Sequence, residues 1–98
     1  MNMFYILINA RPKPGTSEAS KTAGAFVNCW VLKATENEAK DRVSFMLEND
    51  GWIINEIQEI KKVDKEYYSS DSEGLAYFEQ ALTDGEVLII NTWPLEIQ

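Results

Sequence analysis

The sequence contains no histidine and only one cysteine among its 98 residues. Without histidine, the chain alone cannot build a Ser-His-Asp triad, a Cys-His nucleophile pair or a histidine-ligated zinc site. A single cysteine cannot form an internal disulfide, which is typical of proteins in a reducing compartment, so we predict a cytoplasmic protein. We expect no catalytic set, no metal and no cofactor, and we favour a non-enzymatic protein.

Long apolar runs and basic side chains are also scarce. No run reaches the roughly twenty apolar residues that a membrane span needs, so we expect no membrane contact. Sixteen acidic against nine basic side chains give a net charge of −7. Such a surface repels phosphates, which argues against a nucleic-acid partner. It fits a basic protein partner, or charge that serves solubility alone.

What the chain does contain is enough apolar material for one core. Hydrophobic residues make up 45% of the sequence, which argues against disorder. Ninety-eight residues suffice for one core but not for two. We therefore predict a single domain over residues 1–98.

The stretch from Gly24 to Ile60 gives the clearest pattern: a strand, a helix and a second strand. Residues 25–32 follow the two-residue period of a strand. Thr35 and Glu38 form a capping box, which predicts the start of the helix. Gly51 predicts its end, because glycine adopts the left-handed conformation at little cost. The predicted buried stripe of this helix is Ala39, Val43, Met46 and Leu47.

Weaker patterns predict the segments on either side. The apolar run Met3–Ile8 indicates a buried strand. Asn9–Ala23 is rich in proline, glycine and small polar residues, which predicts a long flexible loop. The segment Lys61–Ser70 is highly charged, but Tyr67 and Tyr68, with Val63, leave open a further short edge strand.

A second helix and a last strand complete the chain. Ser70 with Glu73 resembles a capping box, and Asp84-Gly85 predicts the end of the helix. The last strand is expected over Val87–Trp93. The predicted buried stripe of the helix is Leu75, Phe78 and Leu82, with Ala81 at its margin.

Together these elements predict an α+β fold arranged as a two-layer sandwich. We expect a mixed sheet of four or five strands with both helices on one face, because crossovers between parallel strands are almost always right-handed. The βαβ(β)αβ part of the element order resembles the ferredoxin-like plan, with an added N-terminal strand.

The predicted sheet is apolar on both faces, although helices on one side would cover only one of them. In the strand 25–32, Val27 and Cys29 point to one face, while Phe26 and Trp30 point to the other. An apolar face left open would exceed the patches that monomers usually expose. We therefore expect a second copy of the chain to cover it, giving a homodimer; the alternatives are the long loop, a ligand or a different protein.

Two strands share the pattern Asn-x-Trp, at Asn28 to Trp30 and at Asn91 to Trp93. The two-residue period of a strand places each asparagine beside its tryptophan on one face. If the strands are neighbours, these side chains would line a pocket suited to a small molecule. We favour a second interpretation, in which the tryptophans pack in a core or dimer seam while the asparagines bond the local backbone.

These observations lead to two functional hypotheses. The first is a small non-enzymatic interaction module that dimerises through the uncovered sheet face and binds another protein through its acidic surface. The second is a small-molecule-binding domain or cofactor-free enzyme with an Asn/Trp-lined pocket. Phe45 is expected on the outer side of the first helix, as a lone exposed aromatic or an interface contact. The candidate ligand or interface residues are Phe26, Asn28, Trp30, Phe45, Asn91 and Trp93.

Overall fold

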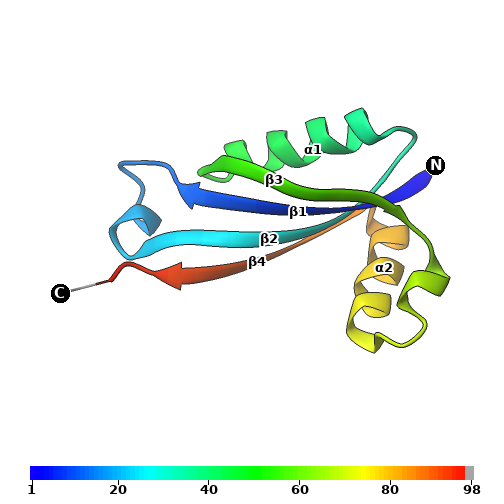
Figure 1. Cartoon of the computed structure of the whole chain (residues 1–98). Coiled ribbons are helices and arrows are strands. Elements are labelled where there is room, and N and C mark those ends of the chain that lie inside the picture. Colours follow the sequence, from blue (N-terminus) through cyan, green and yellow to red (C-terminus); the bar gives the residue numbers. More distant parts are fainter. Residues whose placement is uncertain (97–98) are drawn as a thin grey trace.

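The protein is an α+β fold built on one four-stranded antiparallel sheet (Figure 1). Its structure, a computed structural model, describes residues 1–96 of the 98. Neither helix within that range is long and apolar enough to cross a bilayer. The elements are β1 (Asn2–Pro12), η1 (Glu18–Ser20), β2 (Thr22–Lys33), α1 (Glu36–Asn49), β3 (Trp52–Val63), η2 (Lys65–Tyr68), α2 (Ser72–Asp84) and β4 (Glu86–Pro94), where η denotes a short 3-10 helix.

Capping residues fix where both helices begin. The Thr35 side chain accepts a hydrogen bond from the backbone N–H of Glu38, as the sequence predicts. The cap of α2 is Asp71 rather than Ser70, and it accepts from the N–H of Gly74. Two positions of the predicted stripe on α2 are wrong, because Ala81 is fully buried while Leu82 is exposed.

Two predicted segments differ from the structure. The loop predicted over Asn9–Ala23 is shorter, because β1 continues to Pro12 and β2 already begins at Thr22. The possible fifth strand is wrong: Tyr67 and Tyr68 lie in η2, where the Asp64 side chain accepts a hydrogen bond from the N–H of Tyr67. A capped turn therefore ends β3 instead of a further strand.

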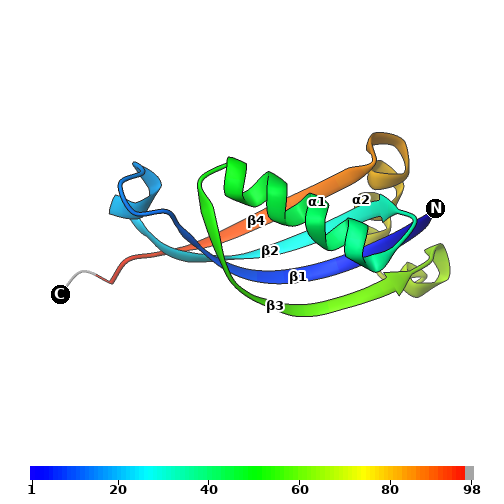
Figure 2. The ribbon, with the colours of Figure 1, turned by 90° about the horizontal axis from the view of Figure 1, so that it is seen from above.

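The prediction of a mixed sheet is wrong, because every pair of neighbouring strands is antiparallel. The order is β3-β1-β2-β4, with β3 and β4 at the two edges (Figure 2). Strands β2 and β3, which α1 connects, do run parallel, but β1 lies between them. The N-terminal strand is therefore central rather than added, and the order is not that of the ferredoxin-like fold.

The two helices lie on opposite faces of the sheet, which corrects the prediction of one helical layer. Figure 1 shows α1 above the sheet and α2 below it, near the start of β4. The right-handed rule applies only to strands that run parallel. Strand β3 runs antiparallel to β4, so the connection through α2 is not such a crossover. We call the side that meets α1 the upper face and the opposite side the lower face.

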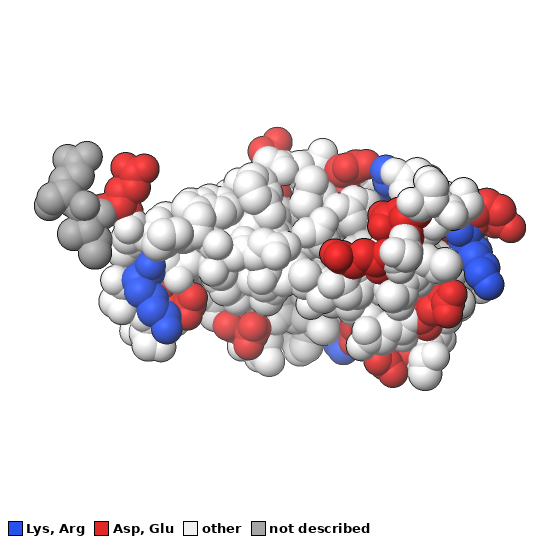
Figure 3. Space-filling view, turned by 90° about the horizontal axis from the view of Figure 1, so that it is seen from below, with Lys and Arg blue, Asp and Glu red and all other residues white. Residues whose placement is uncertain are grey.

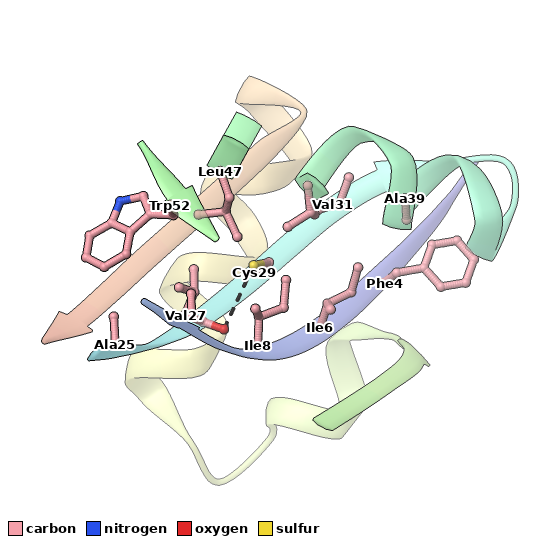
Figure 4. Packing of buried hydrophobic residues seen from close by; sticks show 12 residues of the cluster. Phe4, Ile6, Ile8, Ala25, Val27, Cys29, Val31, Ala39, Leu47 and Trp52 are labelled. Atoms are coloured by element: carbon pink, nitrogen blue, oxygen red, sulfur yellow. Dashed lines mark hydrogen bonds between the residues drawn. The ribbon is translucent and has the colours of Figure 1, made fainter. Parts of the chain in front are cut away.

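The upper face forms the main core (Figure 4). The side chains of Ile6, Ile8 and Val27 on the strands are fully buried against Val43 and Leu47 of α1. Burying each large aliphatic side chain stabilises the fold by about 1.5–3 kcal/mol. Cys29 lies in this core, and burial raises the pKa of its thiol to about 12. The thiol is therefore a packing group rather than a nucleophile.

Candidate functional site

The lower face is covered at one end only, by η2 and α2. These two helices bury a second cluster, in which Tyr68 and Phe78 pack on Trp30 and Met3 of the sheet. Trp30 retains only 5% of its exposure. The prediction that this whole face is uncovered is therefore wrong, since the chain's own second helix covers the part around Trp30.

A pocket of about 600 Å³ opens where α2 and η2 meet the sheet. All four strands contribute to it, so residues distant in sequence face one space. Its volume lies within the range of small-molecule sites. The residues that line it are Tyr5, Asn28, Trp30, Glu59, Lys61, Tyr67, Tyr68, Asp71, Glu73, Gly74, Tyr77, Ile89 and Asn91.

Trp30 is fixed between three tyrosines at the inner wall of this pocket. Its indole Nε1–H donates to the Tyr68 hydroxyl over 2.7 Å. Its ring lies 5.3 Å from that of Tyr5 and 5.0 Å from that of Tyr77, between centroids. Each such tilted aromatic pair stabilises the fold by about 0.5–1.5 kcal/mol beyond the effect of the apolar area that it buries. The Trp30 indole is therefore held by one hydrogen bond and by aromatic contacts to two further rings.

Gly74 lets η2 approach α2 closely enough to build this wall. A Cβ atom at Gly74 would lie 2.5 Å from the Tyr68 ring and 2.6 Å from the Asp71 carboxylate. Glycine in a helix costs about 1 kcal/mol relative to alanine. The close contact with Tyr68 explains why glycine occupies this helical position.

Two asparagine amides face the pocket from β2 and β4. The Tyr5 hydroxyl donates to Oδ1 of Asn28 over 2.6 Å, and this bond orients the amide. The nitrogen of the same amide carries two donors. Asn91, which pairs in register with Phe26 on β2, is exposed at the same pocket.

Lys61 places a positive charge against two tyrosine rings. Its Nζ lies 4.4 Å from the centroid of Tyr67 and 5.6 Å from that of Tyr5. It also donates to the Tyr67 hydroxyl and forms an ion pair of 2.7 Å with Glu59. The bond to Glu59, followed by that to Tyr67, raises the pKa of Lys61. The ammonium therefore stays charged at neutral pH.

Tyr5 and Tyr68 also stay protonated at neutral pH, because the pKa of each hydroxyl is raised. Burial raises the pKa of Tyr5, and the neighbouring Glu59 adds to that effect. Burial likewise raises the pKa of Tyr68, partly offset by the hydrogen bond from Trp30. A general acid or base works best when its pKa lies near the ambient pH. The pKa values of Tyr5, Lys61 and Tyr68 are all raised further above neutral pH, so none of these three groups is suited to proton transfer there.

The structure brings three of the six predicted site residues to this pocket. Asn28, Trp30 and Asn91 line it, because β2 and β4 are neighbours with matched faces. Trp93 lies further along β4, where its ring packs 5.1 Å from that of Phe26. These two aromatics share the lower face with the pocket but do not line it.

Phe45 is separate from this site. It lies on α1, on the opposite side of the sheet, and is 62% exposed. The Arg42 guanidinium lies 6.0 Å from the centroid of its ring, a loose cation–π contact. Phe45 therefore contributes nothing to the pocket.

Beyond the pocket, the lower face remains open. We call this region the open half; it consists of Leu7, Asn9, Phe26 and Trp93. Phe26 is 40% exposed and Trp93 is 37% exposed. Figure 3 shows acidic side chains toward the end of the molecule that carries α2, while the middle of this face carries few charges. The open half thus exposes two aromatic side chains beside an acidic surface.

The sequence analysis missed most of the lining residues, above all the tyrosines. All four tyrosines of the chain line the pocket, at Tyr5, Tyr67, Tyr68 and Tyr77. They come from β1, η2 and α2, so no local spacing relates them. The adjacent Tyr67 and Tyr68 in a highly charged segment were the one available signal. In the sequence the same pair is also compatible with a short edge strand, so it does not by itself indicate a pocket.

No group of His, Cys, Asp and Glu within residues 1–96 is arranged to hold a metal ion. No known protein family, curated protein or solved structure shows significant similarity to this chain.

Proposed function

We propose that this protein is a small-molecule-binding domain whose ligand occupies the pocket between α2 and the sheet. The observation that carries this proposal is a 600 Å³ space in which an ordered aromatic wall faces two asparagine amides. Ligand sites typically combine apolar or aromatic walls with a few oriented polar groups. Trp30 and Tyr77 supply the wall, and Asn28 supplies an oriented amide.

Binding fits this pocket better than catalysis does. The chain has no histidine, and the pKa values of Tyr5, Lys61 and Tyr68 are all raised away from neutrality. Proton transfer at neutral pH would require a group that titrates there. A ligand held by stacking and amide hydrogen bonds requires no such group.

A fragment screen that monitors tryptophan fluorescence tests this function. We expect ligands to give a saturable change, because Trp30 borders the pocket. In Asn28→Ala, affinity should fall by about two- to thirteenfold, since an amide hydrogen bond contributes about 1 ± 0.5 kcal/mol. Asn37→Ala is the matched control, because Asn37 is exposed on α1 across the sheet.

Amide chemical-shift mapping by NMR locates the bound fragment independently of fluorescence. Shifts should concentrate at Tyr5, Trp30, Gly74 and Asn91, which border one space. The proposal is wrong if no fragment shifts these amides, or if Asn37→Ala weakens binding as much as Asn28→Ala does.

The second candidate is the interaction module, now with β4 as its dimer contact. The two sheet edges differ in protection against strand pairing. Edge β3 carries Glu56, Glu59, Lys61 and Lys62 and has two register shifts against β1, both of which discourage pairing. Edge β4 has no charged residue between Glu86 and its end at Pro94. An uncharged free edge of this kind favours pairing with another strand.

A second copy of the chain fits this edge. Antiparallel pairing of two β4 strands about a twofold axis normal to the sheet would extend it to eight strands. That axis would bring the partner subunit's α2 toward the open half, where Phe26 and Trp93 are exposed. The excess of acidic side chains would then favour a basic protein partner, since complementary charge speeds encounter.

Size-exclusion chromatography with light scattering tests this dimer. We expect twice the 11.2 kDa mass of one chain at micromolar concentrations. Ile90→Lys, which adds a charge to the exposed half of β4, should give a monomer. Gln58→Lys adds the same charge to the β3 edge and should leave the dimer intact. A monomeric wild-type chain, or a dimer that Ile90→Lys leaves unchanged, would rule out this candidate.

A further inference from the structure

We propose that the ligand of this pocket is a small organic cation, such as an amine that carries an apolar or aromatic body. This inference rests on the proposed binding function and adds the charge of the ligand. Three features carry it: the charges that line the pocket, the way its tyrosines already hold an ammonium group, and the unfilled space beside that group.

The charges that line the pocket are predominantly negative. Glu59, Asp71 and Glu73 contribute three carboxylates against the single ammonium of Lys61, which leaves two negative charges in excess. Among residues 1–96, Lys61 pairs with Glu59, while neither Asp71 nor Glu73 has a basic group within 4.0 Å. The start of α2 favours these carboxylates but neutralises only part of their charge. A cation entering the pocket therefore gains attraction, whereas an anion would be repelled.

Two tyrosines of the pocket already bind a positively charged group, the ammonium of Lys61. Its ammonium lies over the rings of Tyr67 and Tyr5, at 4.4 and 5.6 Å, and contacts the Tyr67 hydroxyl. The negative face of an aromatic ring attracts cations within about 6 Å. One end of the pocket is thus a built ammonium site, which the protein fills with its own side chain.

The rest of the pocket offers the same kinds of group without a resident cation. Tyr77 packs on Trp30 at one wall, and Glu73 lies in the first turn of α2, on the same helix. Asn28 and Asn91 border the space from the sheet. A ligand ammonium would lie near the Asp71 and Glu73 carboxylates, with its apolar body against Trp30 and Tyr77. The net charge of −7 would also raise the local concentration of cations.

A matched series of three probes tests the charge of the ligand. Phenethylamine, 2-phenylethanol and phenylacetate have the same ring and similar length, but are cationic, neutral and anionic. Binding is measured by calorimetry and located by NMR amide shifts at Tyr5, Trp30 and Asn91. We expect phenethylamine to bind about two- to fivefold more tightly than the alcohol, which is the usual contribution of cation–π contacts at partly exposed sites. Phenylacetate should bind most weakly.

Two variants separate charge from shape. Glu73→Gln should weaken phenethylamine binding by about two- to fivefold and leave 2-phenylethanol unchanged, while Glu79→Gln, outside the pocket, should affect neither. Lys61→Met removes the resident cation, so it should tighten phenethylamine binding and weaken phenylacetate binding further.

The outcomes distinguish this inference from the proposed function. If 2-phenylethanol or phenylacetate shifts the same amides with equal or higher affinity than phenethylamine, the cation inference is wrong and the binding function stands. If Lys61→Met weakens phenethylamine binding, the inference is wrong as well. If neither the three probes nor any member of the fragment library shifts the pocket amides, the binding function fails and the inference fails with it.

Discussion

Replacing Trp30 with alanine is expected to lower the free energy of unfolding by about 3–5 kcal/mol, the usual cost of removing a large buried aromatic side chain. Trp30 is 5% exposed and packs between Tyr5 and Tyr77. The substitution also removes the hydrogen bond that its indole donates to Tyr68. Urea denaturation followed by far-UV circular dichroism measures the change.

Trp93→Ala is the matched control on the same face of the sheet. Trp93 is 37% exposed and packs mainly on Phe26 and Gly24, so its removal should cost only about 1 kcal/mol. The difference between the two variants measures the cover that α2 and η2 provide. Equal losses would mean that the second helix does not shield Trp30, and the pocket would lose its inner wall.

Replacing Leu47 with alanine should destabilise the fold by about 2–5 kcal/mol. Leu47 is 1% exposed and packs between α1 and the upper face of the sheet (Figure 4). Close packing leaves its neighbours little room to fill the space of the lost side chain. Thermal and urea denaturation of the purified variant give this change in the free energy of unfolding.

Phe45→Ala, on the same helix, separates burial from helix propensity. Phe45 is 62% exposed, so its loss should change the free energy of unfolding by no more than about 0.5 kcal/mol. Alanine is a good helix former at both positions, and any difference therefore reports packing. A large effect at Phe45 would instead identify a buried contact on the outer side of α1.

The sequence predicted the elements that depend on nearby residues. Thr35 caps α1 because its hydroxyl reaches the N–H of a residue only three positions away. Gly51 and Gly85 follow the two helices with positive φ angles of 90° and 91°, which glycine adopts most easily. The shared face of Asn28 and Trp30 follows equally from the two-residue period of a strand.

The sequence failed where the outcome depended on partners distant in the chain. Nothing local states that β1 inserts between β2 and β3, or that β3 and β4 run antiparallel at opposite edges. The second fact leaves the face that α2 covers outside the right-handed rule, because that rule applies only to a connection between parallel strands. The prediction assumed that β3 and β4 run parallel. It therefore placed α2 on the wrong face of the sheet and predicted an uncovered lower face.

The pocket shows the same division between local and tertiary information. The sequence by itself determined that apolar side chains lie on both faces of the sheet, and that Asn28 and Trp30 lie side by side. Only the tertiary structure decided that α2 closes over Trp30, and that Tyr5, Tyr68 and Tyr77 converge around it. Periodicity and capping act over a few residues, whereas this convergence depends on strand order and on contacts between segments more than 60 residues apart.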